Sequence, residues 1–439
     1  MASTSVSRTP SSAGNRRKFT LSVWCKKHSS SQMNFIGTGA SNDQNHIQFA
    51  DDRFRIRHFS NTTDILVSTK ALLRDPSAWY HLVCSVDTTQ STASNRVKLY
   101  INGELAELND TTYPSQNYDW NFNDTEIHYI GRRAHSNAYL FDGIMSHFHW
   151  IDGTAYDASP FGSTDSTTGQ WTINIEPSVT YGTNGFFLFK DNASLTDQSG
   201  NSNNFTLSAG TLTKTEDTPD NVFATMNRLD NYYFNGTFSN GDNTVVSNAG
   251  VESYWTSTLG ASSGKFYWEV KISSSGSGKD FIGIADKVAE ASDFTPYSGN
   301  SNMRSYYGFD GEGRNGSTDT GVFDGATFGT GDIIGVAMDL DNNKLYFSKN
   351  GTFQNSGVPT SGSTGTGAMD IPTSSTGYWF AQGANIHNTS STFQTNFGNG
   401  FFGTTAVSSA GTNASGHGIF EYDVPTGYTA LCTKGINSF

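Results

Sequence analysis

The chain has few of the cysteines that cross-link small secreted domains and lacks the long apolar segments that cross membranes. Only three of its 439 residues are cysteines (Cys25, Cys84 and Cys432), and they lie far apart, so neither a disulfide framework nor a site of paired zinc ligands is expected. No segment approaches the roughly 20 apolar residues of a membrane-spanning helix. The first residues contain no apolar run, which predicts that no signal peptide directs export. We therefore expect a protein that is made in a reducing cytoplasm and does not insert into a membrane.

Charged residues are also scarce, at 15% of the chain, and the net charge is −13. An acidic chain lacks the positive surface that binds phosphate backbones, so general nucleic-acid binding is not expected. The hydrophobic fraction is low, at 35%. In its place the sequence has 46 glycines and 13% aromatic residues, a composition typical of turn-rich β structure whose cores are filled by rings.

Two hairpins of the same design divide the sequence. In residues 331–353, apolar residues alternate with small or polar ones before and after a turn at 341–343, and Asn350 and Gly351 close a second turn. Residues 79–105 repeat this plan, with a turn at Asn102 and Gly103. Because such a strand is apolar on one face only, each hairpin predicts a half-buried sheet. The chain exceeds one typical core, so we predict an all-β protein with two antiparallel β-sandwich domains in series.

The first half carries motifs that resemble a known family. They are FTLSVWCKK (19–27), WYHLVCSVD (79–87), VKLYINGEL (97–105), IGR (130–132) and FDGIMSHFHWIDG (141–153). In this order they resemble the laminin-G domains, which are concanavalin A-like jelly-roll sandwiches. An apolar strand followed by an Asp-x-Ser-Gly-Asn turn opens many such domains, whereas here this pattern (185–207) comes last. A sandwich with adjacent termini tolerates such a permutation, so we expect this segment to close the domain.

The second half resembles a SPRY domain. The matching segments are GKFYWEVKI (264–272), FIGIAD (281–286), the hairpin at 331–353, FQTNFG (393–398) and VPTGYTAL (424–431). SPRY domains are antiparallel β-sandwiches that bind partners through loops at one end, so the resemblance implies a binding module. We place the boundaries at 1–18 for an N-terminal arm, 19–210 for the laminin-G-like sandwich, 211–221 for a polar linker and 222–439 for the SPRY-like sandwich.

No set of residues for catalysis is evident. The glutamates are scattered, and the sequence lacks the Glu-x-Asp-x-x-Glu run that glycoside hydrolases of this fold typically carry on a strand. A Gly-x-Ser-x-Gly elbow and a Walker loop are absent as well. We therefore expect no enzymatic activity. His147 and His149 alternate on one strand, and we expect them to be surface histidines rather than metal ligands.

Recognition by exposed rings and amides remains. Tyr and Trp stack on sugar rings at small entropic cost, while Asn and Asp bind hydroxyls. The candidate ligand-binding residues, of which we expect about half to be core residues, are Tyr254, Trp255, Tyr306, Tyr307, Arg314, Trp379 and Phe380 in the second half and Tyr118, Trp120 and Tyr139 in the first.

Two further groups of side chains are candidates for binding. Arg53, Arg55 and Arg57 share one strand face, which could grip an acidic glycan or a neighbouring subunit, although a solvated face is favoured. Laminin-G-like folds often hold one calcium ion, and Asp191 and Asp197 are the weak candidates for its ligands. No other cofactor is expected.

A closer resemblance concerns the origin of the chain. RTPSSAGNRRKFT, RDPSAWYH, TTQSTASNRVKLYING, TYPSQNYD and DQSGNSNNFT are similar to a version of this domain that recurs in proteins of marine bacteriophages, often joined to a SPRY-like domain. The resemblance covers nearly the whole chain and implies a virion protein on the particle surface, made in the host cytoplasm.

This resemblance sets the functional expectation. We expect a non-enzymatic tail-fibre or receptor-binding component that recognises host cell-surface carbohydrate. The alternative is a capsid-decoration or tail-assembly protein whose partners are other virion proteins, because the chain lacks the coiled-coil shaft of a self-sufficient fibre. A polysaccharide depolymerase is less favoured than either. A homo-oligomer is expected if the chain is part of a virion.

Overall fold

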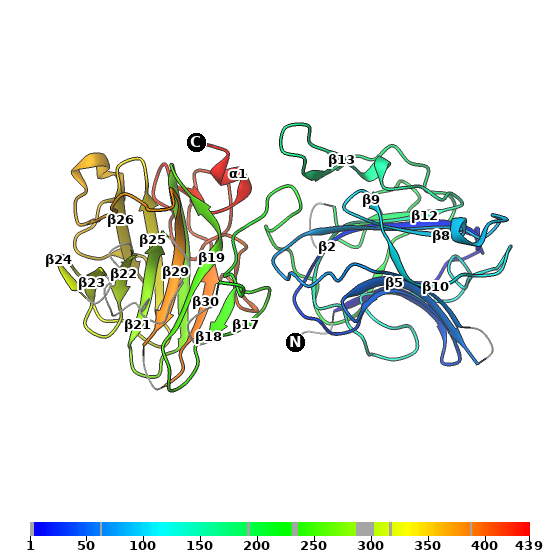
Figure 1. Cartoon of the computed structure of the whole chain (residues 1–439), viewed down its shortest axis with the longest axis horizontal. Helices are drawn as coiled ribbons and strands as arrows, with labels where there is room; N and C mark the ends of the chain where they lie inside the picture. Colours follow the sequence, from blue (N-terminus) through cyan, green and yellow to red (C-terminus); the bar gives the residue numbers. More distant parts are fainter. Residues whose placement is uncertain are drawn as a thin grey trace. The chain divides into compact units, whose positions relative to one another are not determined.

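The computed structural model describes residues 4–61, 64–190, 194–230, 236–286, 303–315, 318–386 and 389–439. Nearly all of the regular structure is β, and the chain divides into two compact units, Met1–Lys214 and Thr215–Phe439, here called the first and second domains (Figure 1). Each is a sandwich of two sheets, which confirms the predicted fold class. In the part of the chain that the structure describes, no helix is long and apolar enough to cross a membrane.

The first domain packs an eight-stranded sheet against a six-stranded one. The eight strands follow the order β10 (Leu108–Thr112), β6 (Asp64–Thr69), β5 (Arg53–Ser60), β4 (Asp43–Ala50), β3 (Met33–Ala40), β11 (His128–Ile130), β1 (Ser5–Arg8) and β16 (Thr206–Ala209). The six strands follow the order β15 (Phe186–Leu188), β12 (Gly143–Asp152), β2 (Lys18–Lys27), β7 (Tyr80–Asp87), β8 (Val97–Ile101) and β9 (Glu104–Leu105). The remaining elements are the hairpin of β13 (Gly162–Thr164) and β14 (Trp171–Ile173) and the 3-10 turns η1 (Ala93–Asn95) and η2 (Ser159–Phe161).

The hairpin expected at 79–105 forms as β7, β8 and β9. Leu82 and Cys84 of β7 point into the core, as their alternation predicts. Asn102 (φ 48°) and Gly103 (φ 86°) both adopt left-handed conformations, which a two-residue turn between twisted strands requires and which these two residue types tolerate best. The sequence signal for this turn is therefore confirmed.

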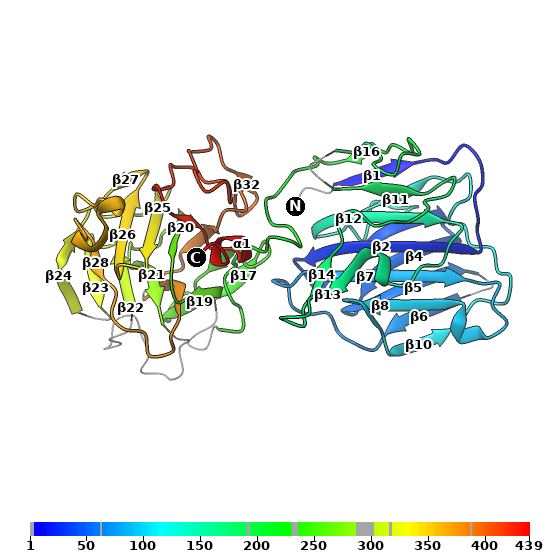
Figure 2. The same cartoon turned by 90° about the horizontal axis from the view of Figure 1, so that it is seen from above.

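The two ends of the first domain meet in one sheet. Strand β1 pairs with β11 on one side and with β16 on the other, and Figure 2 shows it lying between them. Residues 5–8 are thus part of the sandwich, which differs from the free arm expected at 1–18. The pairing of β1 with β16 confirms that the segment at 185–207 leads to the closing strand of the domain.

The linker expected at 211–221 belongs largely to the second domain. The Thr215 hydroxyl donates to the Asn399 carbonyl (3.2 Å), and the Lys434 amide donates to the side-chain oxygen of Asn221 (3.2 Å). These hydrogen bonds join the polar segment to residues near the end of the chain. A polar composition identified the segment between the two cores, but it did not reveal which domain holds it.

The second domain is built in the same way. Its nine-stranded sheet consists of β17 (Thr237–Ser239), β18 (Thr244–Val246), β30 (Thr392–Asn396), β20 (Lys265–Ser274), β25 (Ile333–Asp339), β26 (Lys344–Lys349) and β27 (Thr352–Phe353) in that order, with β28 (Met369–Asp370) on β26 and β33 (Thr429–Ala430) on β20. The six-stranded sheet has the order β19 (Ser253–Ala261), β29 (Trp379–Asn385), β21 (Asp280–Ala285), β22 (Met303–Tyr307), β23 (Glu312–Asn315) and β24 (Thr318–Asp324). The other elements are β31 (Phe401–Phe402), β32 (Thr405–Ala406), η3 (Pro359–Thr364) and α1 (Thr433–Ile436).

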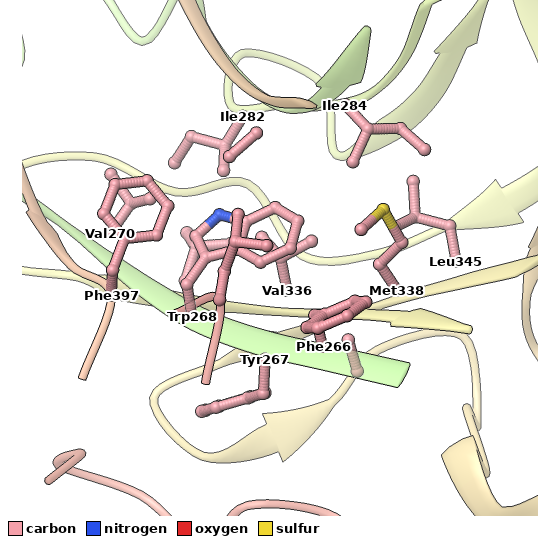
Figure 3. Packing of buried hydrophobic residues seen from close by; sticks show 14 of the residues in the cluster. Phe266, Tyr267, Trp268, Val270, Ile282, Ile284, Val336, Met338, Leu345 and Phe397 are labelled. Atoms are coloured by element: carbon pink, nitrogen blue, oxygen red, sulfur yellow. The ribbon is translucent and has the colours of Figure 1, made fainter. Parts of the chain in front are cut away.

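The core of the second domain lies between these sheets. Figure 3 shows Ile282 and Ile284 of β21 facing Trp268 of β20 and Met338 of β25, and all four are fully buried. Burial of such side chains is the main favourable term in folding. The hairpin of β25 and β26 forms where the alternation at 331–353 predicts it.

The buried carboxylate of Glu269 binds a late segment of the chain, residues 421–422, to the nine-stranded sheet. Tyr267 lies on the opposite side of β20 from Trp268 (Figure 3), and its hydroxyl donates to Glu269 (3.1 Å). The Glu269 carboxylate also accepts from the backbone amides of Glu421 (2.8 Å) and Tyr422 (2.9 Å). Burial raises the pKa of Glu269 to about 7.

Candidate functional site

The structure buries most of the rings that were expected to bind a ligand. Tyr307 is 5% exposed, and the others of this group are less so; the group comprises Trp120, Tyr254, Trp255, Tyr306, Tyr307 and Trp379. Trp255, for example, meets Phe393 edge to face (4.9 Å between ring centroids), and Tyr307 stacks on Phe281 (4.3 Å). A buried ring cannot stack on a sugar, so the expectation of a ligand-binding role is wrong for these six residues.

The remaining four candidates differ in their surroundings. Arg314 forms ion pairs with Asp310 and Glu312, and Phe380 is half-buried. Tyr118 is half-buried, with its ring at the edge of Trp120 (5.5 Å). Tyr139 is 38% exposed and is the member of the set with the largest free surface.

Of the two expected calcium ligands, Asp197 is not free to bind an ion. Asp191 lies outside the described residues. Asp197 is buried, and its Oδ1 accepts from the amides of Phe187 and Ser199 (2.8 Å each), while its Oδ2 accepts from the Ser199 hydroxyl and the Asn203 amide (2.8 Å each). These donors take the lone pairs that a calcium ion would need, which contradicts the assignment of Asp197. Among the described residues, no group of three or more His, Cys, Asp or Glu side chains could hold a metal.

His147 and His149 are buried, contrary to the expectation of surface histidines. The His149 ring stacks on Phe187 (4.0 Å) and hydrogen-bonds the Tyr181 hydroxyl (2.8 Å). His81 lies nearby on β7, where Trp171 of β14 donates to its Nδ1 (3.0 Å). The segment that includes β13 and β14 therefore covers the outer face of the six-stranded sheet. Burial lowers the pKa of His81 to about 3.

A row of polar side chains crosses the outer face of the eight-stranded sheet. Register places Asn34, Gln48, Arg55, Ser68 and Asp110 opposite one another, one from each of β3, β4, β5, β6 and β10. We call these five residues the polar row and this face the polar face. The alternate residues of these strands fill the core, so the polar row lies on the outer side of the sheet. Neighbouring side chains cover much of it, because Asn34, Gln48 and Ser68 are at most 1% exposed. The strands bend so that the polar face is concave (Figure 1).

Hydrogen bonds hold the polar row in place. With its amide oriented to satisfy its neighbours, Gln48 accepts from Arg55 Nε (2.9 Å) and Nη2 (3.1 Å) and donates to Asn34 (2.7 Å). Asn34 in turn bonds His46 Nδ1 (3.2 Å). At the other end of the row, the Ser68 hydroxyl donates to Asp110. The amides of this row are thus fixed in one orientation before any ligand arrives.

The hydrogen-bonded chain continues to an arginine from another part of the sequence. His46 Nε2 bonds Gln44 Oε1 (3.1 Å), and the same oxygen accepts from Arg133 Nε (2.5 Å). Arg133 lies in the segment that follows β11, and it stacks on the ring of Tyr139 (5.2 Å). Burial, followed by the positive charges of Arg133 and its neighbours, lowers the pKa of His46 to about 3, so this imidazole is neutral near pH 7.

The sequence revealed part of this site. The alternation of Arg53, Arg55 and Arg57 places them on one face of β5, as predicted. Gln44, His46 and Gln48 of β4 have the same spacing, so the sequence also carried a signal for the neighbouring strand. Arg133 could not have been found from spacing, because it reaches the face from a distant loop.

The crystal structure of the SPRY domain of human HERC1 is similar, with 16% identity over 35% of this chain and 86% of that chain and a TM-score of 0.26. A search of curated proteins gives no match. The family model of the concanavalin A-like lectin/glucanases superfamily matches residues 2–159, and the model of the SPRY domain matches residues 265–390. On these two family matches, the chain carries a concanavalin A-like domain followed by a SPRY domain.

Proposed function

We propose that the chain is a non-enzymatic recognition protein of a phage particle surface, which binds host carbohydrate through the polar face of its concanavalin A-like domain. The observation that carries the proposal is the group of partly exposed side chains that borders the buried polar row on this face: Arg57, Phe59, Asp64, Arg133 and Tyr139. Guanidinium, carboxylate and phenol groups offer donors and acceptors that match sugar hydroxyls. Because Arg57 already bonds Asp64 and Arg133 already bonds Gln44, these arginines lose little rotamer entropy when a ligand binds.

The carboxylates on the polar face favour binding over hydrolysis. Asp64 accepts two hydrogen bonds from Arg57 (3.2 and 3.1 Å), and Asp110 accepts from Ser68 and from Asn109 (3.1 Å). The hydrogen bonds to Asp110 lower its pKa. A glycosidase needs a general acid whose pKa is raised, so that it stays protonated. Asp110, whose pKa is lowered, is suited to stay ionised instead.

The glycan-binding role predicts unequal effects of two tyrosines. Tyr139→Ala removes the exposed ring beside Arg133 and is expected to weaken binding of the full chain to host surface glycans about threefold to tenfold, in line with the energy of ring stacking. The matched control is Tyr378→Ala in the SPRY domain, a ring that is 52% exposed and expected to have no effect. Saturation binding of labelled protein to a glycan array measures both.

Three results would contradict this role. Absence of saturable binding to any glycan would exclude carbohydrate recognition. Loss of binding in Tyr378→Ala with normal binding in Tyr139→Ala would move the site to the SPRY domain. Release of reducing ends from a bound polysaccharide would show a depolymerase instead of a binding protein.

The assignment to a phage particle rests on the resemblance of the sequence to marine phage proteins. A receptor-binding component and a capsid-decoration or assembly protein differ in their place on the particle and in their partners, which are host glycans in the first case and other virion proteins in the second. Immunogold labelling of particles with antibody against the chain separates the two. Label at the tail supports attachment, label over the head supports decoration, and particles without label contradict both.

A further inference from the structure

We infer that the sugar bound on the polar face carries an anionic group, a carboxylate or a sulfate, and that Arg133, Arg55 and Arg57 hold this group above His46. The inference rests on the proposed function, because it names the ligand class of the same face. It concerns charge, whereas the proposed function concerns only carbohydrate, so the two can fail separately.

Strand register gathers the three guanidinium groups around one imidazole. Arg57 of β5 lies directly opposite His46 of β4, and Arg55 is two residues away on the same face. Arg133 approaches from the segment after β11 and is fixed to Gln44, which His46 also bonds. The lowered pKa of His46, to which all three arginines contribute, agrees with this arrangement. The immediate surroundings of His46 are therefore cationic, although the net charge of the chain is −13 and the carboxylates of Asp51, Asp64 and Asp110 lie farther out on the same face.

Arg133 presents donors that are ready for an anion. Its Nε bonds Gln44, while its two terminal nitrogens contact no hydrogen-bond acceptor among the residues that the structure describes. A guanidinium with a free edge matches the two oxygens of a carboxylate or sulfate. Because its Nε is anchored and Tyr139 stacks on it, this edge is held in one direction.

The other two arginines have carboxylate partners that an anion can replace. Arg55 lies 3.6 Å from Asp51, whose side chain is 86% exposed. Arg57 pairs with Asp64, which is about half exposed. Ion pairs at such positions contribute little to stability, so exchanging or sharing the carboxylate costs little. Asp110, at the end of the polar row, is bonded by Ser68 and Asn109.

Aromatic rings on the same face favour an acidic sugar over an acidic peptide. Arg133 lies over the ring of Tyr139 and Arg57 over the ring of Phe59, with 5.2 Å between guanidinium and ring in each case. Both rings are 38% exposed. A pyranose offers a flat apolar face for a ring, hydroxyls for the exposed Asp64 carboxylate, and an acid group for an arginine. A polyglutamate peptide offers acid groups and backbone hydrogen bonds but no flat apolar face.

The test compares ligands that differ in charge and in backbone. Isothermal titration of the full chain uses an oligogalacturonate, a sulfated oligosaccharide, a neutral dextran oligosaccharide and a short polyglutamate. We expect one or both acidic oligosaccharides to bind at least about tenfold more tightly than the neutral one and the polyglutamate. Raising the salt from about 50 mM to about 300 mM is expected to weaken this binding, because the charges lie near the surface.

Variants assign the charge to the polar face. Arg133→Ala is expected to weaken binding of the acidic oligosaccharide about tenfold or more, and Arg133→Lys, which keeps the charge but loses the planar edge, is expected to retain part of it. The matched control is Arg17→Ala in the same domain, an exposed arginine paired with Asp119, which is expected to bind normally. Circular dichroism checks that each variant is folded, and Arg57→Ala replaces Arg133→Ala if that variant is not.

Each outcome has a definite meaning. Equal binding of neutral and acidic sugars, unchanged in the arginine variants, overturns the inference and leaves the proposed function standing. Polyglutamate that binds as tightly as the acidic sugars overturns the glycan class in favour of an acidic protein partner. If none of these probes binds and the host glycan array is also negative, the proposed function falls and the inference falls with it.

Discussion

Acidification from about pH 7 to about pH 4 is expected to unfold the concanavalin A-like domain while the SPRY domain stays folded. Burial is the main cause that lowers the pKa of five histidines in the concanavalin A-like domain: His46 to about 3, His81 to about 3, His128 to about 4, His149 well below its usual value, and His58. The imidazoles of His46 and His81, whose pKa values are lowest, become protonated near pH 5 only when native packing is lost.

The direction in which pH changes the stability of this domain follows from proton binding. Below the unfolded pKa of about 6.5, the unfolded domain takes up protons at these histidines and the folded domain does not, so stability falls as the pH falls from about 6.5 toward about 3. At about pH 4.5, a histidine whose folded pKa is near 3 costs the folded state about 3 kcal/mol. Two or three such groups equal the whole stability of a typical domain.

Two buried carboxyls of the SPRY domain have the opposite effect. Burial raises the pKa of Glu269 to about 7 and that of Asp230 to about 6. The folded SPRY domain therefore binds more protons than its unfolded state between about pH 4 and about pH 7, and its stability rises as the pH falls through this window. The two domains are thus expected to differ most in stability near pH 4.5.

Hydrogen exchange of the full chain, read peptide by peptide and corrected for the intrinsic rate, measures the two domains separately. Protection of β2 and β12 is expected to be lost between about pH 6 and about pH 4.5, while protection of β20 and β25 persists. His135→Gln, at an exposed position, serves as a control that leaves the transition unchanged. Loss of protection in the SPRY domain first, or in both domains together, would contradict the assignment.

The alternation of apolar residues predicted the strands and both hairpins because it depends on neighbours in the sequence. It predicts which face of a strand a side chain occupies, but it does not tell what covers that face. His149 shows the difference: it lies on the face of β12 that points away from the main core, yet Phe187 and Tyr181 bury it. Tyr254 and Tyr307 were predicted to be surface candidates for the same reason, because alternation did not reveal what covers their face. They pack in a small cluster outside the main core.

The sequence predicted only the part of the candidate site that lies on one strand, β5. Arg53, Arg55 and Arg57 were recognised as one face because their spacing is local. Their partners in the site come from other segments. Gln48 and His46 lie beside them because β4 pairs with β5, and Arg133 reaches the same face from the loop after β11. Register is set by the whole sheet, and a single sequence carries little information about it.

Replacing Asp197 by alanine is expected to destabilise the concanavalin A-like domain by roughly 3–5 kcal/mol. The carboxylate accepts three backbone amides, those of Phe187, Ser199 and Asn203, together with the Ser199 hydroxyl. Each buried donor left without a partner costs about 1–3 kcal/mol, reduced where water can enter. Asp197→Asn keeps one acceptor oxygen but turns an amide nitrogen toward these donors, so an intermediate loss is expected. Denaturant unfolding followed by hydrogen exchange in β15 measures the change.

The same residue was a calcium candidate, so the experiment also decides between a structural and an ion-binding carboxylate. If the hydrogen bonds account for its role, a chelator leaves the unfolding midpoint of the unmodified protein unchanged. Asp165→Ala is the matched control, because Asp165 accepts from Thr167 and Thr168 in a similar turn but at the surface, and it should destabilise the domain much less than Asp197→Ala. A midpoint that falls with chelator and recovers with calcium, beside a mild effect of Asp197→Ala, would mean that an ion rather than this carboxylate holds the turn together.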